Sequence, residues 1–238
     1  MDTHARTPHS RRERPAKPPL TRAGIVSTAV GLLRAEGLER VTMRRLAQEL
    51  DTGPASLYVY VHNTAELHAA VLDELLGEVV PIPAGTDRDW RDRLAHVLTS
   101  YLEVLFAHPG LARSALVARP SGEHYLDLVE AVLALLDEGG VPPGRAAWAV
   151  DLLLQFATVT AAEQTTRDRG VAAEEDRDAL AAALRDVSRD RHPHIAALGT
   201  ELLSGSGRTR LAWGIDVLIG GLLTTPRPDT GPSQDQRG

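Results

Sequence analysis

Residues 42–61 read TMRRLAQELDTGPASLYVYV and predict two short helices joined by a tight turn. Thr42 suits the cap of the first helix, because its hydroxyl can accept a hydrogen bond from a free backbone N–H. Thr52-Gly53-Pro54 then interrupts the helical pattern, and Pro54 fits the first turn of a second helix. A supporting helix followed by a short second helix is typical of the helix-turn-helix, whose second helix enters the major groove of DNA.

The apolar positions of this stretch favour that interpretation. One seam can form from Leu46, Leu50, Leu57 and Val61, and Ala47 is small enough to let two helices approach closely. The residues that begin the second helix have little bulk, so its backbone can lie near the floor of a groove. The alternative is an ordinary helical hairpin in a core, which would use the same seam without binding DNA.

The side chains expected to contact DNA lie at helix N-termini and on the second helix. Free backbone N–H groups and the helix dipole favour phosphates at these termini, and exposed hydroxyls can reach bases or phosphates. The expected DNA-binding residues are Thr42, Arg44, Arg45, Gly53, Pro54, Ala55, Ser56, Tyr58, Tyr60, His62, Asn63 and Thr64.

Helical signals flank the stretch on both sides. Thr21 caps a helix that Gly37 ends, and Asn63, with Glu66 three residues on, resembles a capping box for a helix that ends before Pro81. Residues 20–80 are therefore expected to form a small DNA-binding domain that contains a three-helix helix-turn-helix unit.

The remaining chain predicts only helices, so the fold class is all-α. A boundary is expected at residues 81–85, which read PIPAG, and a larger domain for ligand binding and dimerisation at 86–225. Its expected helices cover residues 90–106, a short stretch to about 117, 121–137, 145–167, 174–189, a short apolar segment at 195–203, and 209–223. Residues 226–238 are rich in proline and glycine and are interpreted as a disordered tail.

Composition and charge narrow the classes of protein. The 238 residues include no cysteine, which excludes disulfides, thiolate metal sites and cysteine nucleophiles. No apolar run approaches about 18 residues, and no signal peptide is recognisable, so the expected location is cytoplasmic, away from membranes. The net charge is +3 over residues 1–19, 0 over 20–66 and −9 over the rest. We interpret residues 1–19 as a disordered basic arm, either a solvated tail or a segment that follows DNA phosphates.

Residues 20–80 resemble the DNA-binding domain of the TetR family of repressors. The resemblance covers three helices in order, through Leu20-Thr21, Val41-Thr42-Met43-Arg44-Arg45-Leu46-Ala47, Pro54-Ala55-Ser56-Leu57-Tyr58, His62-Asn63 and Glu66-Leu67. The chain departs from the family pattern at Asp51, Thr52, Gly53, Val59-Tyr60 and Thr64, so we expect its base preference to differ from that of close relatives.

The second domain resembles the tetracycline-repressor branch, through Arg119-Pro120 with Tyr125, then Glu163, and finally Trp213-Gly214-Ile215-Asp216 with Gly220-Gly221. This resemblance implies a small-molecule cavity and a homodimer built on the long helix near 145–167 and the last helix near 209–223. Ordinary packing within one chain is the alternative use of these helices.

The cavity is expected to have apolar walls and few polar anchors. Candidate ligand-binding residues are Leu105, Phe106, His108, Leu116, Arg119, Trp148, Leu152, Gln155, Phe156, Val159, Thr160 and Glu163. For each, a place in the core or in solvent is an equal alternative. Glu163 corresponds to an acid that helps to hold magnesium in the tetracycline-bound relative, but Ala115 falls near the place of its metal-binding histidine. No metal and no cofactor is therefore expected. The pair His192 and His194 is interpreted as a solvated loop.

No nucleophile elbow, phosphate loop or zinc-protease motif is present, so an enzyme is not expected. We expect a repressor that a small-molecule effector releases from a palindromic, double-stranded DNA operator. Two alternatives stay open. One is a regulator of the same fold that responds to a protein partner or to no signal, and the other is a helical binding protein or enzyme with a vestigial first domain.

Overall fold

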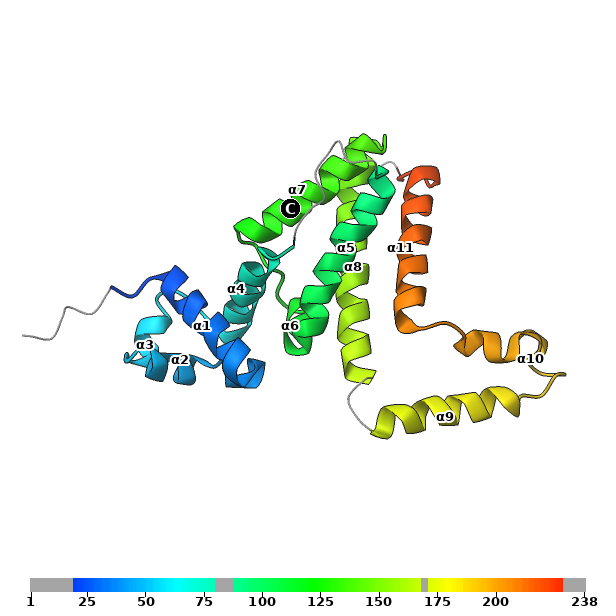
Figure 1. Ribbon diagram of the computed structural model, residues 1–238, viewed down its shortest axis with the longest axis horizontal. Coiled ribbons are helices and arrows are strands. Elements are labelled where there is room, and N and C mark those ends of the chain that lie inside the picture. Colours follow the sequence, from blue (N-terminus) through cyan, green and yellow to red (C-terminus); the bar gives the residue numbers. More distant parts are fainter. Residues whose placement is uncertain (1–18, 80–87, 168–170, 229–238) are drawn as a thin grey trace, which may run out of the picture.

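The computed structural model describes residues 19–79, 88–167 and 171–228, and within these ranges it contains helices and no strand. The small domain formed by α1–α4 lies at one end of the molecule in Figure 1, and a bundle of longer helices follows it. The expected all-α fold with a small first domain is thereby confirmed. The basic arm and the PIPAG boundary lie outside the described residues, apart from Pro19.

The first domain contains α1 (Arg22–Glu36), the 3-10 turn η1 (Leu38–Arg40), α2 (Met43–Glu49), α3 (Pro54–Leu57) and α4 (Thr64–Leu76). All three predicted caps are present: the side chain of Thr21 accepts from the N–H of Gly24, that of Thr42 from Arg45, and that of Asn63 from Glu66. Each cap satisfies a backbone donor that has no partner inside its helix.

The turn before α3 depends on Asp51, whose φ of 47° lies in the left-handed region. Aspartate tolerates this conformation better than most residues, so the turn forms without glycine. The helix after the turn is shorter than predicted, because α3 ends at Leu57 and residues 58–60 form a turn. The N–H of Val61 still bonds to the carbonyl of Leu57, so the chain keeps a helical path through Tyr58 and Val59.

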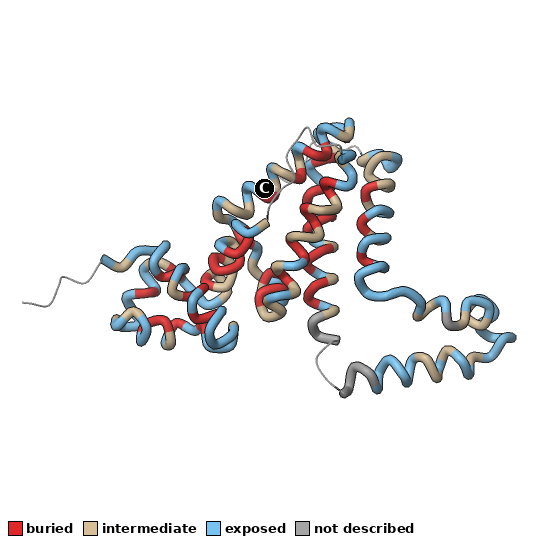
Figure 2. Tube along the Cα trace, in the orientation of Figure 1, coloured by how far each residue is buried: buried red, intermediate tan, exposed pale blue. Residues whose placement is uncertain are grey.

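The second domain is built around α5 (Trp90–Ala107), whose Leu94, Leu98, Leu102 and Leu105 are fully buried. It packs against α7 (Glu123–Glu138), α8 (Pro143–Arg167) and α11 (Gly207–Thr224), while the short α6 (Pro109–Ala115) packs against α8 and α4. These helices begin and end within two residues of the predicted bounds. Figure 2 shows the buried faces of α5 and α8 meeting in the middle of the bundle.

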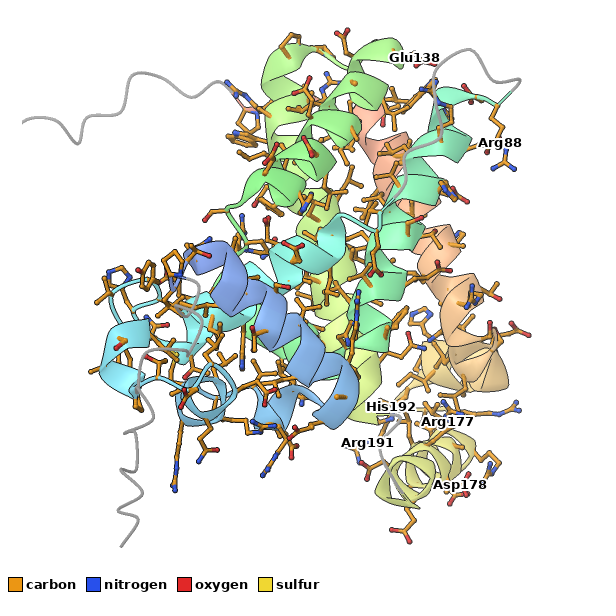
Figure 3. The ribbon with its side chains drawn as sticks, turned by 60° about the vertical axis from the view of Figure 1, so that its left-hand side comes forward. Arg88, Glu138, Arg177, Asp178, Arg191 and His192 are labelled. Atoms are coloured by element: carbon orange, nitrogen blue, oxygen red, sulfur yellow. The ribbon has the colours of Figure 1, made fainter. Side chains whose placement is uncertain are left out.

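Three further elements form an arm: α9 (Val171–Arg185), α10 (Pro193–Leu198) and the 3-10 turn η2 (Gly199–Leu203). The α9 helix begins three residues earlier and ends four residues earlier than predicted. The arm packs mainly on itself and extends away from the bundle in Figure 1. Figure 3 shows Arg177 of α9 and Arg191 before α10 at the opposite end of the molecule from Glu138.

Helix α4 joins the two domains, because it packs against α1 on one side and against α6 and α7 on the other. The carboxylate of Asp73 accepts a hydrogen bond from the N–H of Tyr125 in the first turn of α7, at 3.0 Å. Gly122 makes this contact possible, since a Cβ there would lie 2.0 Å from Oδ2 of Asp73. Helix α4 is therefore in direct contact with the second domain.

Within the described part of the chain, no helix combines the length and the apolar character that crossing a bilayer requires.

Candidate nucleic-acid interface and ligand cavity

The surface of the helix-turn-helix is a continuous exposed segment. Residues 53–56 are all exposed, and they are followed by Tyr58 at 50% and Val59 at 75% exposure. Between and after them, Leu57 and Val61 are fully buried and anchor the segment in the core beside Leu46. The segment is thus held rigidly while its outer face stays free to meet a ligand.

The two arginines of α2 have different environments. Arg44 is exposed and forms no ion pair with any described residue. Arg45 instead donates from Nη2 to Oε1 of Glu36 at 2.7 Å and from Nη1 to Oε2 of Glu49 at 2.8 Å, and these carboxylates raise its pKa further above the usual value. Arg45 therefore joins α2 to α1, and Arg44 is the more exposed of the two arginines.

The other predicted contacts near helix N-termini are partly engaged in capping. The side-chain oxygens of Thr42 and Asn63 accept backbone hydrogen bonds, whereas Thr64 is exposed. His62 is also exposed, with its backbone N–H and its ring Nδ1 both 2.8 Å from Oε2 of Glu66. Tyr60 is half-buried and packs against the core. These groups surround the start of α4, where the helix dipole favours an anion.

Replacing Glu66 by alanine should lower the free energy of unfolding at neutral pH by about 1 kcal/mol, because the capping box of α4 loses one acceptor. The backbone N–H and ring of His62 hold the pKa of Glu66 below its usual value. Its contribution is therefore complete above the unfolded-state pKa and disappears as the pH falls through the folded-state pKa.

Denaturant unfolding of both proteins between pH 7 and pH 3 measures this effect. The difference between them should shrink towards the acid end of this range. Glu66→Gln is the matched control, since it retains an acceptor without a titratable carboxyl group. A difference that stays constant with pH would contradict the role of the carboxylate.

A cavity of about 340 Å³ lies in the second domain, between α5, α8 and α11. Its apolar wall includes Leu102, Leu211 and Ile215, which are buried. Its polar groups include the acidic Glu103 and the basic Arg208. The full lining is Thr99, Leu102, Glu103, Phe106, Pro109, Gln164, Arg208, Leu211, Ala212 and Ile215. Such a lining suits a small molecule with an apolar body and a few polar groups.

Of the predicted ligand-binding residues, only Phe106 lines this cavity. Leu105 is fully buried in the core, His108 is half-buried with a pKa lowered by burial, and Leu116 is exposed. Thr160 is half-buried, and the ring of Phe156 lies over Gly214, where a Cβ would be 2.8 Å from Cζ. The remaining residues of α8 are exposed, on the face away from the core: Trp148, Leu152, Gln155, Val159 and Glu163.

The long helix contributes only Gln164 to the lining of this cavity, and the predicted ligand-binding role of its other residues stays a prediction. The buried face of α8 consists instead of residues such as Leu153, Leu154 and Ala157, which pack into the core. The cavity residues that the prediction missed lie mostly on α5 and α11. Leu211 and Ile215 are spaced four apart in an apolar helix, but that spacing does not reveal which neighbouring helix they face.

Arg119 lies in a separate polar cluster, where its Nη1 donates to Asp151 of α8. Nearby, the hydroxyl of Tyr101 shares a hydrogen bond of 2.7 Å with Thr158, and burial raises the pKa of Tyr101 to about 12. Arg119 therefore lies over the outer surface of the bundle and does not line the cavity.

Two family models match successive parts of the chain. Residues 25–71 match the model of bacterial regulatory proteins of the tetR family, and residues 82–225 match the tetracyclin repressor-like C-terminal domain. The repressor DrrR1 of Streptomyces coeruleorubidus is 30% identical over 88% of this chain and 82% of its own length.

Two solved structures extend this similarity. A protein described as a transcription regulator from Streptomyces coelicolor is 60% identical, over 91% of this chain and all of that chain, with a TM-score of 0.77. ActR from Streptomyces coelicolor, solved in complex with actinorhodin, is 38% identical over 86% of this chain and 97% of that chain, with a TM-score of 0.75. These relatives are regulators and not enzymes. With the exposed helix-turn-helix and the helical second domain, the matches show that this chain belongs to the TetR family of DNA-binding transcriptional regulators.

Proposed function

We propose that the protein is a homodimeric repressor that binds a palindromic operator and is released from it by a small molecule. The observation that carries this proposal is the presence of an exposed helix-turn-helix segment and a cavity in one chain. One is the exposed reading segment at residues 53–59, and the other is the cavity between α5, α8 and α11. Support comes from ActR, a relative that is 38% identical and was solved in complex with actinorhodin.

The DNA contacts fall into two groups. Exposed Arg44 and the groups at the start of α4 are placed to meet phosphates, which fix the register of the protein on the duplex. The reading segment enters the major groove and meets base edges. The full set of proposed contacts is Thr42, Arg44, Gly53, Pro54, Ala55, Ser56, Tyr58, Tyr60, His62, Asn63 and Thr64.

The dimer interface that we propose is the exposed stripe on α8 and α11. Trp148, Leu152 and Val159 are between 42% and 49% exposed on α8, and Trp213 and Val217 of α11 are 68% and 50% exposed. Burying such side chains against a second copy removes a large apolar area from water. Gly220 and Gly221 have open space where a Cβ would lie, which lets the partner's helix approach the backbone closely.

The helix α6 links the cavity to the DNA-binding domain. Its first residue, Pro109, lines the cavity, and a Cβ on Gly110 would lie 2.4 Å from Cδ2 of Leu38 in η1. At its other end, Ser114 is 3.0 Å from Nδ1 of His68, whose Nε2 is 3.3 Å from the carbonyl of Val41. A ligand that displaces α6 would therefore act on the residues directly before α2.

Release then follows from a shift between two arrangements of the domains. Two recognition helices must lie about 34–36 Å apart to enter successive major grooves. An effector that binds more tightly to an arrangement with another spacing stabilises that arrangement. The affinity for DNA then falls, at most by the ratio of the effector's affinities for the two arrangements.

Selection of genomic DNA fragments by the purified dimer, followed by a compound screen on the recovered fragment, tests the proposal. We expect one palindromic sequence to be enriched, with an affinity that falls steeply with salt. Release of that fragment by a small molecule supports effector control. Enrichment of no sequence would contradict operator binding, and an operator that no compound releases would favour control by a protein partner.

Replacing Tyr58 by alanine should weaken operator binding about 30-fold, because each of two half-sites loses a contact worth about 1 kcal/mol. Tyr58 is 50% exposed and is not one of the buried core residues. Fluorescence anisotropy with the selected operator measures the affinity, and sedimentation checks that the dimer persists. Tyr58→Phe separates the hydroxyl from the ring. Unchanged affinity in Tyr58→Ala would exclude the proposed docking.

A further inference from the structure

The reading segment has an unusual chemical composition. Residues 53–59, and their neighbours Thr52, Tyr60 and Val61, contain no charged side chain, no carboxamide and no histidine. In the major groove, arginine or lysine reads guanine, asparagine or glutamine reads adenine, and an acidic side chain can accept from cytosine. None of these pairings is available to the segment itself, so it must read bases by other means.

Two kinds of group remain on its outer face. Ser56 and Tyr58 present hydroxyls, which can bond to several different bases and therefore discriminate weakly. Ala55 and Val59 present methyl groups, and Val59 is 75% exposed although its neighbours Leu57 and Val61 are fully buried. The helical path through Tyr58 and Val59 puts residue 59 one turn after residue 55, so Ala55 and Val59 lie on the same face.

We propose that Val59, with Ala55 beside it, reads the C5-methyl groups of thymines in the major groove. The proposal rests on the DNA-binding function proposed above. Of the four bases, only thymine displays a methyl group in this groove, and an apolar side chain recognises it by excluding water. Each operator half-site should therefore carry a thymine opposite Val59, on either strand. Arg44 lies on α2, outside this segment, and can contact phosphate or guanine at the same time.

The side chain of Val59 is exposed and carries no hydrogen-bonding group. A valine side chain has no donor for a phosphate oxygen. Next to phosphates it would displace their hydrating water without replacing the lost hydrogen bonds. An apolar contact with a base is thus the interaction that the exposed methyls can make.

Deoxyuridine substitution of the selected operator provides the test, because it removes the methyl group of a thymine and leaves its hydrogen-bonding edge intact. Each thymine is replaced in turn, symmetrically in both half-sites, and binding is measured by anisotropy. At one symmetrical position, we expect the unmodified protein to bind about 15-fold more weakly, which corresponds to a factor of about four for each methyl group.

The Val59→Ala protein should lose this discrimination and bind the thymine and uracil forms of that position with a ratio near one. The matched control is Val117→Ala, since Val117 is 83% exposed but lies after α6, away from the reading segment. This control should keep the full ratio.

Two results would overturn the inference: a ratio near one at every thymine in the unmodified protein, or a ratio at the sensitive position that is the same in Val59→Ala as in the unmodified protein. Failure to bind any selected DNA is a different outcome, because it removes the proposed operator function itself.

Discussion

A chain that carries Val159→Glu together with Val217→Glu should be a monomer and should bind the operator about 1,000-fold more weakly than the unmodified chain. The two valines are about half-exposed and lie on α8 and α11, within the apolar stripe that we propose as the dimer interface. A carboxylate buried there without a partner opposes association strongly. The monomer then holds only one half-site and loses the advantage of a second, linked contact.

Sedimentation measures the oligomeric state, and anisotropy with the full palindrome and with a single half-site measures binding. Leu126→Glu is the matched control, because Leu126 is 60% exposed on α7, outside the stripe. This control should stay dimeric and bind normally, and thermal unfolding should show that all variants are folded. A dimer that persists in the double variant would place the interface elsewhere.

The first domain could be predicted closely because its signals are local. Thr21, Thr42 and Asn63 each cap a helix through a donor three residues on, so the sequence itself contains both partners. The turn at Asp51 depends on one residue's tolerance of positive φ. Even here a longer contact was missed: Glu36 lies nine residues before Arg45, and pattern alone does not show that they pair.

The helices of the second domain could be predicted from the sequence, but the lining of its cavity could not. Both faces of α8 contain apolar residues, such as Leu153 on the buried face and Leu152 on the exposed one. Periodicity therefore cannot tell which face meets the core, a ligand or a second chain. The cavity depends on how α11 packs against α5, two helices separated by about a hundred residues, and this pairing has no sequence signal.

The interpretation of α8 changes accordingly. Trp148, Leu152 and Val159 were expected in the cavity, and their exposure makes them better candidates for contact with a second copy. We propose that the effector binds on the opposite side of this helix pair, where Gln164 and Ile215 line the cavity. Effector and partner would thus contact different faces of α8 and α11, so that a ligand can act without separating the dimer.

Filling the cavity should produce a repressor that no effector releases. Thr99→Trp and Ala212→Trp introduce a large ring from opposite walls, on α5 and α11, into a space of about 340 Å³. We expect the compound that releases the unmodified protein to be needed at concentrations at least about 100-fold higher, because its volume is occupied. Operator affinity should stay within about threefold, since neither residue lies in the DNA-binding domain. Overpacking should cost about 1–3 kcal/mol of stability.

Ser100→Trp is the control on the same helix, because Ser100 is half-buried like Thr99 but does not line the cavity. It should respond to the compound at the ordinary concentration. Titration of the compound against the protein–operator complex gives the midpoint of release, and sedimentation confirms that Ala212→Trp remains a dimer despite its place beside Trp213.

If both cavity variants were released as easily as the unmodified protein, the effector would have to bind outside this cavity. The cluster of Arg119, Asp151 and Tyr101 would then be the next place to examine, because it offers polar groups around a buried phenol on the other side of α5.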